Sequence, residues 1–144
     1  MEGGRFNNNT RAVLEAVQAM DHHPTVYEIY HEVQRSRPGV GLATVYRAAR
    51  RLVEMRLIKD LDGGHSGSRY DARTERHDHA LCTSCGALLD LPVEITISAE
   101  AACLAAEAAG LQMFSHEVRL YGRCKSCATS AAVQYPCAEA EKNE

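Results

Sequence analysis

The chain has 144 residues, of which 45% are hydrophobic and 24% charged, with a formal net charge of -3. This length fits one ordinary domain or two small ones, and the hydrophobic share excludes a chain that is disordered throughout. No run approaches the ~18 apolar residues of a membrane span, and residues 1–10 lack the apolar stretch of a secretory signal. We therefore expect a cytoplasmic protein without a membrane partner.

The charge is divided unevenly along the chain. Residues 1–72 carry ten basic and nine acidic side chains, whereas residues 73–144 carry six and ten. This difference indicates two modules, and the basic side chains of the first gather between residues 44 and 59. A local basic patch can hold a phosphate backbone even on a mildly acidic protein.

Three helices are predicted in the first module. Apolar side chains at helical spacing predict a helix over residues 11–20, with Thr10 as its N-cap. Residues 25–36 open with the Thr-x-x-Glu pattern of a capping box and continue one apolar stripe, which predicts a second helix. The break at residues 38–41 is followed by a third apolar stripe over residues 42–53.

Two short strands, residues 57–61 and 68–71, flank a turn-rich segment and predict a β-hairpin. Three helices followed by a hairpin describe a winged helix-turn-helix over residues 1–72. In that geometry the third helix enters the major groove of DNA while the hairpin reaches the flanking backbone. For the third helix alone, the alternative is a solvated basic face without a partner.

A polar linker, residues 73–76, leads into a second module over residues 77–127, and residues 128–144 are predicted to be a flexible tail. The elements predicted in the second module are a strand over residues 87–91, a helix over residues 98–109 and a strand over residues 111–121. About 50 residues make a small core, so bound zinc and dimerisation are expected to support it. Cys103, on the apolar helix, is expected to be part of that core.

Metal ligands are concentrated where the second module begins. The chain contains two Cys-x-x-Cys pairs, Cys82 with Cys85 and Cys124 with Cys127. Four such thiolates suit a closed tetrahedral zinc site, and in a reducing cytosol they indicate metal binding rather than disulfide bonds. A redox-active dithiol is the alternative. His77 and His79 are two residues apart, so both imidazoles leave one face of an extended strand and can chelate a harder or borderline ion.

Together these features resemble the ferric uptake regulator family of bacterial metal-dependent transcriptional repressors. The resemblance covers residues 5–127. Its motifs, in family order, are His22-His23-Pro24-Thr25, Leu42-Ala43-Thr44-Val45-Tyr46-Arg47, Ser68-Arg69-Tyr70-Asp71, the His-x-His-x-x-Cys-x-x-Cys-Gly segment that starts at His77, and Tyr121-Gly122-Arg123-Cys124. The resemblance implies an α+β protein with a winged helix-turn-helix DNA-binding domain and a C-terminal α/β dimerisation domain. It also implies a homodimer on a double-stranded DNA operator and one structural Zn2+ per subunit.

The resemblance further implies a regulatory metal, Fe2+ or Mn2+, bound by residues from both modules. Its ligands would be His23, Asp71, His77, His79 and Asp90. Such a metal would fix the angle between the paired DNA-binding heads and hence their half-site spacing. The side chains expected to contact DNA are Thr44, Tyr46, Arg47, Arg50 and Arg51.

Both carboxylate ligands are Asp, which resembles the peroxide-sensing branch of the family. The resemblance implies that bound iron and peroxide oxidise His23 or His77, and that the repressor then leaves DNA, whereas manganese supports binding without this chemistry. The alternative within the family is an iron- or zinc-uptake regulator that responds to metal supply. An alternative from another class is an enzyme, either a non-haem iron oxygenase or a thiol redox enzyme. The five protein ligands weaken the oxygenase alternative, because an oxygenase needs open coordination positions on its iron for substrate and oxygen.

The sequence departs from the family pattern in several places. The family's first helix, which often adds DNA contacts, has little counterpart here, and Asn7-Asn8-Asn9 replaces a typical Thr-Pro-Gln. Arg47 stands where the peroxide branch often has Asn, and it can contact guanine with two hydrogen bonds. Arg76 stands where many iron regulators have His, which argues against their additional metal site and leaves His116 either structural or ligating.

Overall fold

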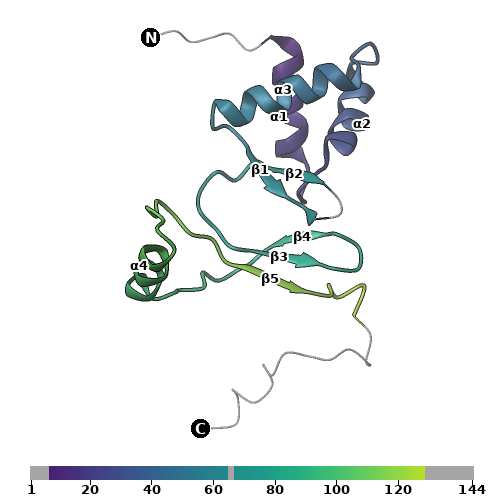
Figure 1. Cartoon of the computed structure of the whole chain (residues 1–144). Helices are drawn as coiled ribbons and strands as arrows, with labels where there is room; N and C mark the ends of the chain where they lie inside the picture. The colour runs from purple at the N-terminus through teal and green to yellow at the C-terminus, as the bar shows by residue number, and fades with distance from the viewer. Residues whose placement is uncertain (1–6, 65–66, 129–144) are drawn as a thin grey trace.

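The computed structural model describes residues 7–64 and 67–128 (Figure 1). Its elements in chain order are α1 (Asn8–Ala19), α2 (Val26–Ser36), α3 (Leu42–Glu54), β1 (Lys59–Asp62), β2 (Ser68–Asp71), β3 (His79–Cys82), β4 (Leu88–Asp90), α4 (Ala99–Ala108) and β5 (Arg119–Gly122). Helices α1 to α3 gather at one end and the β3–β5 sheet with α4 at the other, with the hairpin β1–β2 between them. The predicted α+β class, a winged helix-turn-helix followed by a second α/β module, is confirmed.

Side-chain caps fix where the helices begin. At α2 both halves of the predicted capping box between Thr25 and Glu28 are present. At α1 the N-cap is Asn7, whose side chain accepts a hydrogen bond from the Thr10 backbone N–H at 2.7 Å, so the prediction of Thr10 as the cap was wrong. The reason is that three consecutive asparagines, all favoured cap residues, precede Thr10 and allow the helix to start earlier.

The core of the first module lies between its three helices and the hairpin. Each helix contributes a stripe of apolar side chains at the predicted spacing, and β2 adds an aromatic ring. The buried residues of this core are Val13, Ala16, Val17, Ile29, Val33, Val45, Ala48, Ala49, Leu52, Ile58 and Tyr70. Because Tyr70 belongs to β2, the hairpin is packed firmly against the helices.

In the second module β3 is the central strand. It pairs antiparallel with β4, which sets His79 opposite Asp90, and parallel with β5, which sets Cys82 opposite Gly122. The strand predicted over residues 111–121 was wrong for most of its length, since only Arg119–Gly122 pairs. A strand forms only where a neighbour offers hydrogen bonds, and β3 is four residues long.

Helix α4 packs little against its own chain. Ser98 caps it as predicted and Gly110, with a φ of 69°, follows its end. Ala106 is its one buried residue among those described, and Cys103 is exposed, so the prediction that Cys103 belongs to the core was wrong. The helix is rich in alanine, and apart from Ala106 its residues are exposed or half-buried.

The two modules meet through a small apolar contact and the linker. Leu61 of β1 packs with Leu81 of β3 and Leu88 of β4, and the Arg119 guanidinium donates to the Asp62 carbonyl. Residues 72–78 contain neither helix nor strand. The domain boundaries at 72, 76 and 127 stay a prediction, and residues 129–144 of the proposed tail lie outside the described residues. In the described ranges no helix has the length and apolar content to cross a bilayer.

Candidate metal centres and DNA-reading helix

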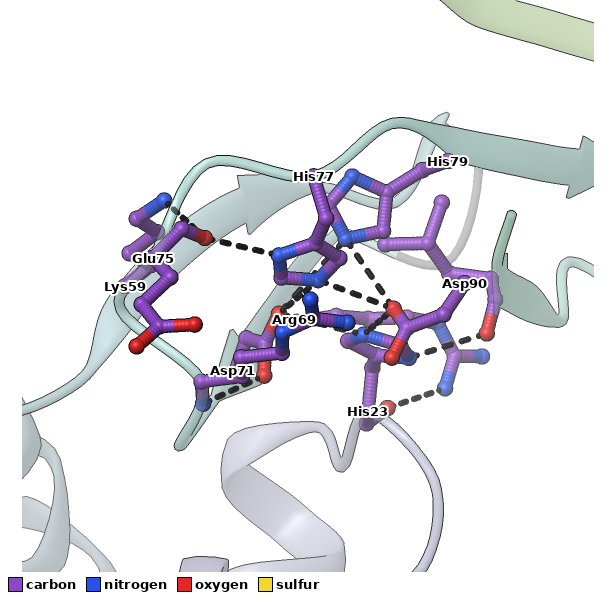
Figure 2. Close-up of polar contacts among 10 residues, drawn as sticks. His23, Lys59, Arg69, Asp71, Glu75, His77, His79 and Asp90 are labelled. Carbon is purple, nitrogen blue, oxygen red and sulfur yellow. Dashed lines mark hydrogen bonds and ion pairs between the residues drawn. The ribbon is translucent and has the colours of Figure 1, made fainter. Parts of the chain in front are cut away.

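Five side chains from four segments converge at the junction between the modules (Figure 2). They offer three imidazole nitrogens and two carboxylate oxygens, all within 4.8 Å of one another, and they are His23, Asp71, His77, His79 and Asp90. The residue His23 precedes α2, Asp71 ends β2, and the other three belong to the second module. The structure therefore brings together the whole predicted set of regulatory ligands.

The spacing of these atoms matches ligands around one ion. His23 Nε2 lies 2.9 Å from Asp90 Oδ1 and 3.3 Å from Asp71 Oδ2. His77 Nε2 lies 2.9 Å from Asp71 Oδ2 and 3.0 Å from Asp90 Oδ1. Metal bonds of about 2.1 Å at right angles separate neighbouring ligands by about 3.0 Å. The distances therefore fit a shared metal with these atoms in its shell.

Two ring orientations are fixed by backbone carbonyls. The Nδ1–H of His23 donates to the Leu88 carbonyl at 3.0 Å, and that of His77 donates to the Glu75 carbonyl at 2.8 Å. A ring that donates through Nδ1 keeps its Nε2 lone pair free, as a metal ligand requires. Both Nε2 atoms face the centre of the cluster (Figure 2). This is the usual support that metal-binding histidines receive.

Unpartnered polar atoms also indicate a cation-binding site. Among the described residues, three buried side-chain atoms have no hydrogen-bond partner: Asp71 Oδ2 and His79 Nε2 in the cluster, and Arg69 Nε beside it. Such atoms are costly unless something binds them. A metal ion at the centre of the cluster would satisfy the two cluster atoms, so the donor set fits the Fe2+ or Mn2+ that the family resemblance implies.

The charge state of the cluster suits a cation. Burial alone would raise the pKa of Asp71, but the His23 imidazole beside it, a hydrogen bond from the Arg73 backbone N–H and the nearby His77 lower it to about 2. Burial, followed by the proximity of His77 and His23, lowers the pKa of His79. At neutral pH, Asp71 is therefore an anion and His79 a neutral donor, the forms that bind metal.

Two Cys-x-x-Cys turns form a second cluster. They follow the ends of the parallel neighbours β3 and β5, so sheet pairing alone places them side by side. Gly86, with a φ of 73°, closes the first turn, and its N–H donates to the Cys82 carbonyl at 2.9 Å. The second closes through a bond from the Cys127 N–H to the Cys124 carbonyl, also 2.9 Å. The four sulfurs of Cys82, Cys85, Cys124 and Cys127 lie within 4.8 Å of one another.

Sulfur geometry favours zinc over a disulfide. The Sγ atoms of Cys85 and Cys124 are 3.8 Å apart. Zn–S bonds of about 2.3 Å place tetrahedral sulfurs about 3.8 Å apart, whereas a disulfide needs about 2.05 Å. A hydrogen bond from the Cys124 N–H lowers the pKa of Cys82 to about 6, while sharing a proton with the Cys124 sulfur raises that of Cys127 to about 12. Four thiolates this close therefore need a cation to ionise together.

The predicted DNA-contacting residues lie on α3. Tyr46, Arg47, Arg50 and Arg51 are exposed, while Thr44 is half-buried and its hydroxyl accepts a hydrogen bond from Arg47 at 3.4 Å. A groove of about 450 Å³ between α2 and α3 is lined by Val26, Tyr27, Leu42, Ala43, Tyr46 and Arg47. The exposed ring of Tyr27 was missed by the sequence reasoning, although its place in the first turn of the preceding helix could have indicated it.

His116 belongs to neither metal cluster. Its Nε2 lies 3.1 Å from the Arg76 guanidinium, which also pairs with Glu94 and, at 3.4 Å, with Asp78. Asp78 was missed as a structural residue: its fully buried carboxylate accepts hydrogen bonds from the backbone N–H groups of Ile95 and Val118. The guanidinium of Arg76 is therefore the positive group that faces Asp78 and Glu94.

Comparison with known proteins agrees with the fold. The sequence profile of the ferric uptake regulator family matches residues 2–121. The peroxide operon regulator of Bacillus subtilis is 34% identical over 125 residues, which cover 87% of this chain and 85% of that protein.

Solved structures are similar over most of the chain. The crystal structure of the Campylobacter jejuni peroxide stress regulator superposes with a TM-score of 0.61 at 28% identity, covering 83% of this chain and 88% of that one. The ferric uptake regulator of Helicobacter pylori gives a TM-score of 0.67 at 23% identity, covering 89% and 85% respectively, and so supports the fold.

Proposed function

This chain belongs to the ferric uptake regulator family, and from that premise we propose that it is a transcriptional repressor that senses hydrogen peroxide. Its activity would depend on a regulatory Fe2+ or Mn2+ and on a structural zinc. Family members are transcription regulators, so the oxygenase and thiol redox enzyme alternatives are set aside. Acting on DNA, the protein would work in the cytoplasm.

One observation carries the regulatory role: the five-ligand cluster draws on both modules. His23 and Asp71 come from the winged helix, and His77, His79 and Asp90 from the second module. A metal bound there would join the two modules. Without the metal, the modules would be held together by the contact of Leu61 with Leu81 and Leu88, by the linker and by a few hydrogen bonds. The angle of the DNA-binding heads would therefore depend on the metal.

The peroxide assignment rests on the relatives and on where the cluster is open. Asp90 has 42% of its side chain exposed, whereas Asp71 and the three histidines have 8% or less. His23 and His77 lie closer to Asp90 Oδ1 than His79 does, at 2.9, 3.0 and 3.3 Å. An oxidant that enters beside Asp90 would therefore meet His23 and His77 first.

Bound ferrous iron would supply the electron that breaks the O–O bond of peroxide and would regain one electron from the ring. In the net reaction a ring carbon of His23 or His77 exchanges its C–H for C–O, one peroxide oxygen enters the ring and the other leaves as water. The imidazole loses two electrons and peroxide gains them. An oxygen next to the ligating nitrogen weakens that ligand, so the junction opens and the repressor leaves its operator.

Dimerisation is supported by the exposed apolar surface of the second module. Leu104 on α4 is 60% exposed, Phe114 89% and Tyr121 on β5 67%. Strand β5 is an edge of its sheet, and patches of this kind mark interfaces. A homodimer would present two copies of α3 to a palindromic duplex, each with Tyr46 and Arg47 toward base edges.

Operator binding with each metal, before and after peroxide, tests the proposal. Zinc-loaded protein should bind selected operator DNA with Fe2+ or Mn2+, and peroxide should release only the iron form. Mass spectrometry should then find one added oxygen on the peptide that contains His23 or His77. Peroxide-insensitive binding in both forms, without added oxygen, would contradict peroxide sensing and favour a regulator of iron or zinc uptake.

A further inference from the structure

A largely buried arginine next to the five-ligand cluster has no part in the function described above. Arg69 belongs to β2, two residues before Asp71, so both side chains leave the same face of the strand. Its side chain is 13% exposed. A guanidinium is always charged, and burying one is costly unless its position brings specific contacts.

Arg69 holds the backbone of a proposed metal ligand. Its Nη1 donates to the His23 carbonyl at 2.8 Å (Figure 2). The same segment is fixed by a bond from the Tyr70 N–H to the Pro24 carbonyl at 2.9 Å and by a β-bridge between Thr25 and Arg69. His23 is thereby attached to the strand that carries Asp71, and their ligand atoms lie 3.3 Å apart.

The same guanidinium reaches the start of α2. Arg69 Nη1 lies 3.9 Å from Glu28 Oε2. That oxygen accepts hydrogen bonds from the Thr25 N–H at 2.7 Å and from its hydroxyl at 3.0 Å, which is half of the capping box of α2. One cation therefore contacts both the ligand segment and the cap of the helix that precedes α3.

We propose that Arg69 is a positioning residue that preorganises His23 and Asp71 as half of the regulatory site and links that half to the first turn of α2. This inference rests on the proposed function for the identity of the metal site. The second module supplies the other half of the site. The metal would then join these two halves, and Arg69 holds the half that contains His23 and Asp71 in position before the metal binds. Outer-shell partners of this kind are worth about 10–100-fold in metal affinity.

Arg69→Gln tests the inference, with Arg73→Gln as the matched control. Arg73 is exposed, lies two residues beyond Asp71, and contacts it through the backbone N–H, which the substitution keeps. Zinc-loaded protein is titrated with Co2+, a probe whose visible absorption reports ligand number and geometry. We expect Arg69→Gln to bind Co2+ about 10–100-fold more weakly and with altered bands, and Arg73→Gln to match the original protein.

A second readout uses the metal-free protein. Hydrogen exchange should be faster at the amides of Glu28 and Ile29 in Arg69→Gln and unchanged in β3. Arg69→Lys, which keeps the charge but not the planar fork, should recover part of the Co2+ affinity and allows the measurement if Arg69→Gln does not fold. A role in folding alone would lower the urea midpoint but leave the Co2+ spectrum of folded protein unchanged.

Two results separate this inference from the proposed function. Unchanged Co2+ affinity and unchanged α2 exchange in both Arg69 variants would overturn the role of Arg69 and leave the metal site standing. No Co2+ binding at this cluster in the original protein would overturn the metal site itself. Neither measurement uses DNA or peroxide, so a failure of peroxide sensing does not affect them.

Discussion

Replacing Cys85 by Ser should remove the zinc and unfold the second module while the first stays folded. The buried apolar cluster at the β3–β5 sheet consists of Leu81 and Leu88, which pack against Leu61 of β1. At about 1.5–3 kcal/mol each, the three side chains supply roughly 5–9 kcal/mol. Ordering the eleven residues of β3, β4 and β5 costs roughly 11–22 kcal/mol at about 1–2 kcal/mol per residue. A structural zinc supplies about 10–16 kcal/mol, which offsets the difference.

Hydrogen exchange on the whole protein, with zinc content measured in parallel, provides the assay. In Cys85→Ser the β3 amides should lose their protection, whereas α3 amides, held by the larger core of the first module, should keep theirs. Cys103→Ser is the control, since Cys103 is exposed on α4 and outside the cluster. A zinc-free Cys85→Ser protein that kept its β3 protection and remained dimeric would refute the reasoning.

Arg76→Gln should lower the free energy of unfolding by about 1.5–3 kcal/mol, because the buried Asp78 loses a charged partner. The urea midpoint measures this loss, and an unchanged midpoint would show that backbone donors alone satisfy the Asp78 carboxylate. The lowered pKa of Asp71, about 2, means that its carboxylate stabilises the folded protein when the pH is above the ordinary pKa of Asp, and that this stabilisation is lost as the pH falls toward 2. Metal-free protein should therefore lose roughly 2 kcal/mol between about pH 5 and pH 2, and Asp71→Asn should lack this part of the slope. On DNA, Arg47→Ala should relax base preference, whereas Arg50→Ala should weaken all sequences alike and reduce the salt slope by about 1. Equal operator affinity in both variants would contradict the docking of α3.

Most local structure followed from the sequence. The spacing of apolar residues predicted three helices, and the Thr25 and Glu28 pair marked the start of α2, because a helix and its cap depend on residues a turn apart. The two Cys-x-x-Cys pairs indicated one tetrahedral site by their chemistry alone. The sequence also indicated a chelating pair in His77 and His79, although His77 precedes β3 and is turned by the Glu75 carbonyl.

Contacts between distant segments were decided only by the tertiary structure. Residue patterns did not reveal that His23 and His77 lie in one cluster, which required the family resemblance. The segment before α2 contacts β4, where His23 bonds to the Leu88 carbonyl. Nothing in the sequence marks Arg69 as the partner of the His23 carbonyl or Asp78 as a buried acceptor of backbone hydrogen bonds. The strand expected over residues 111–121 failed for the same reason, because pairing depends on a neighbour. The local periodicity of apolar residues determines which secondary-structure element forms, whereas contacts between side chains of distant segments depend on how the elements pack.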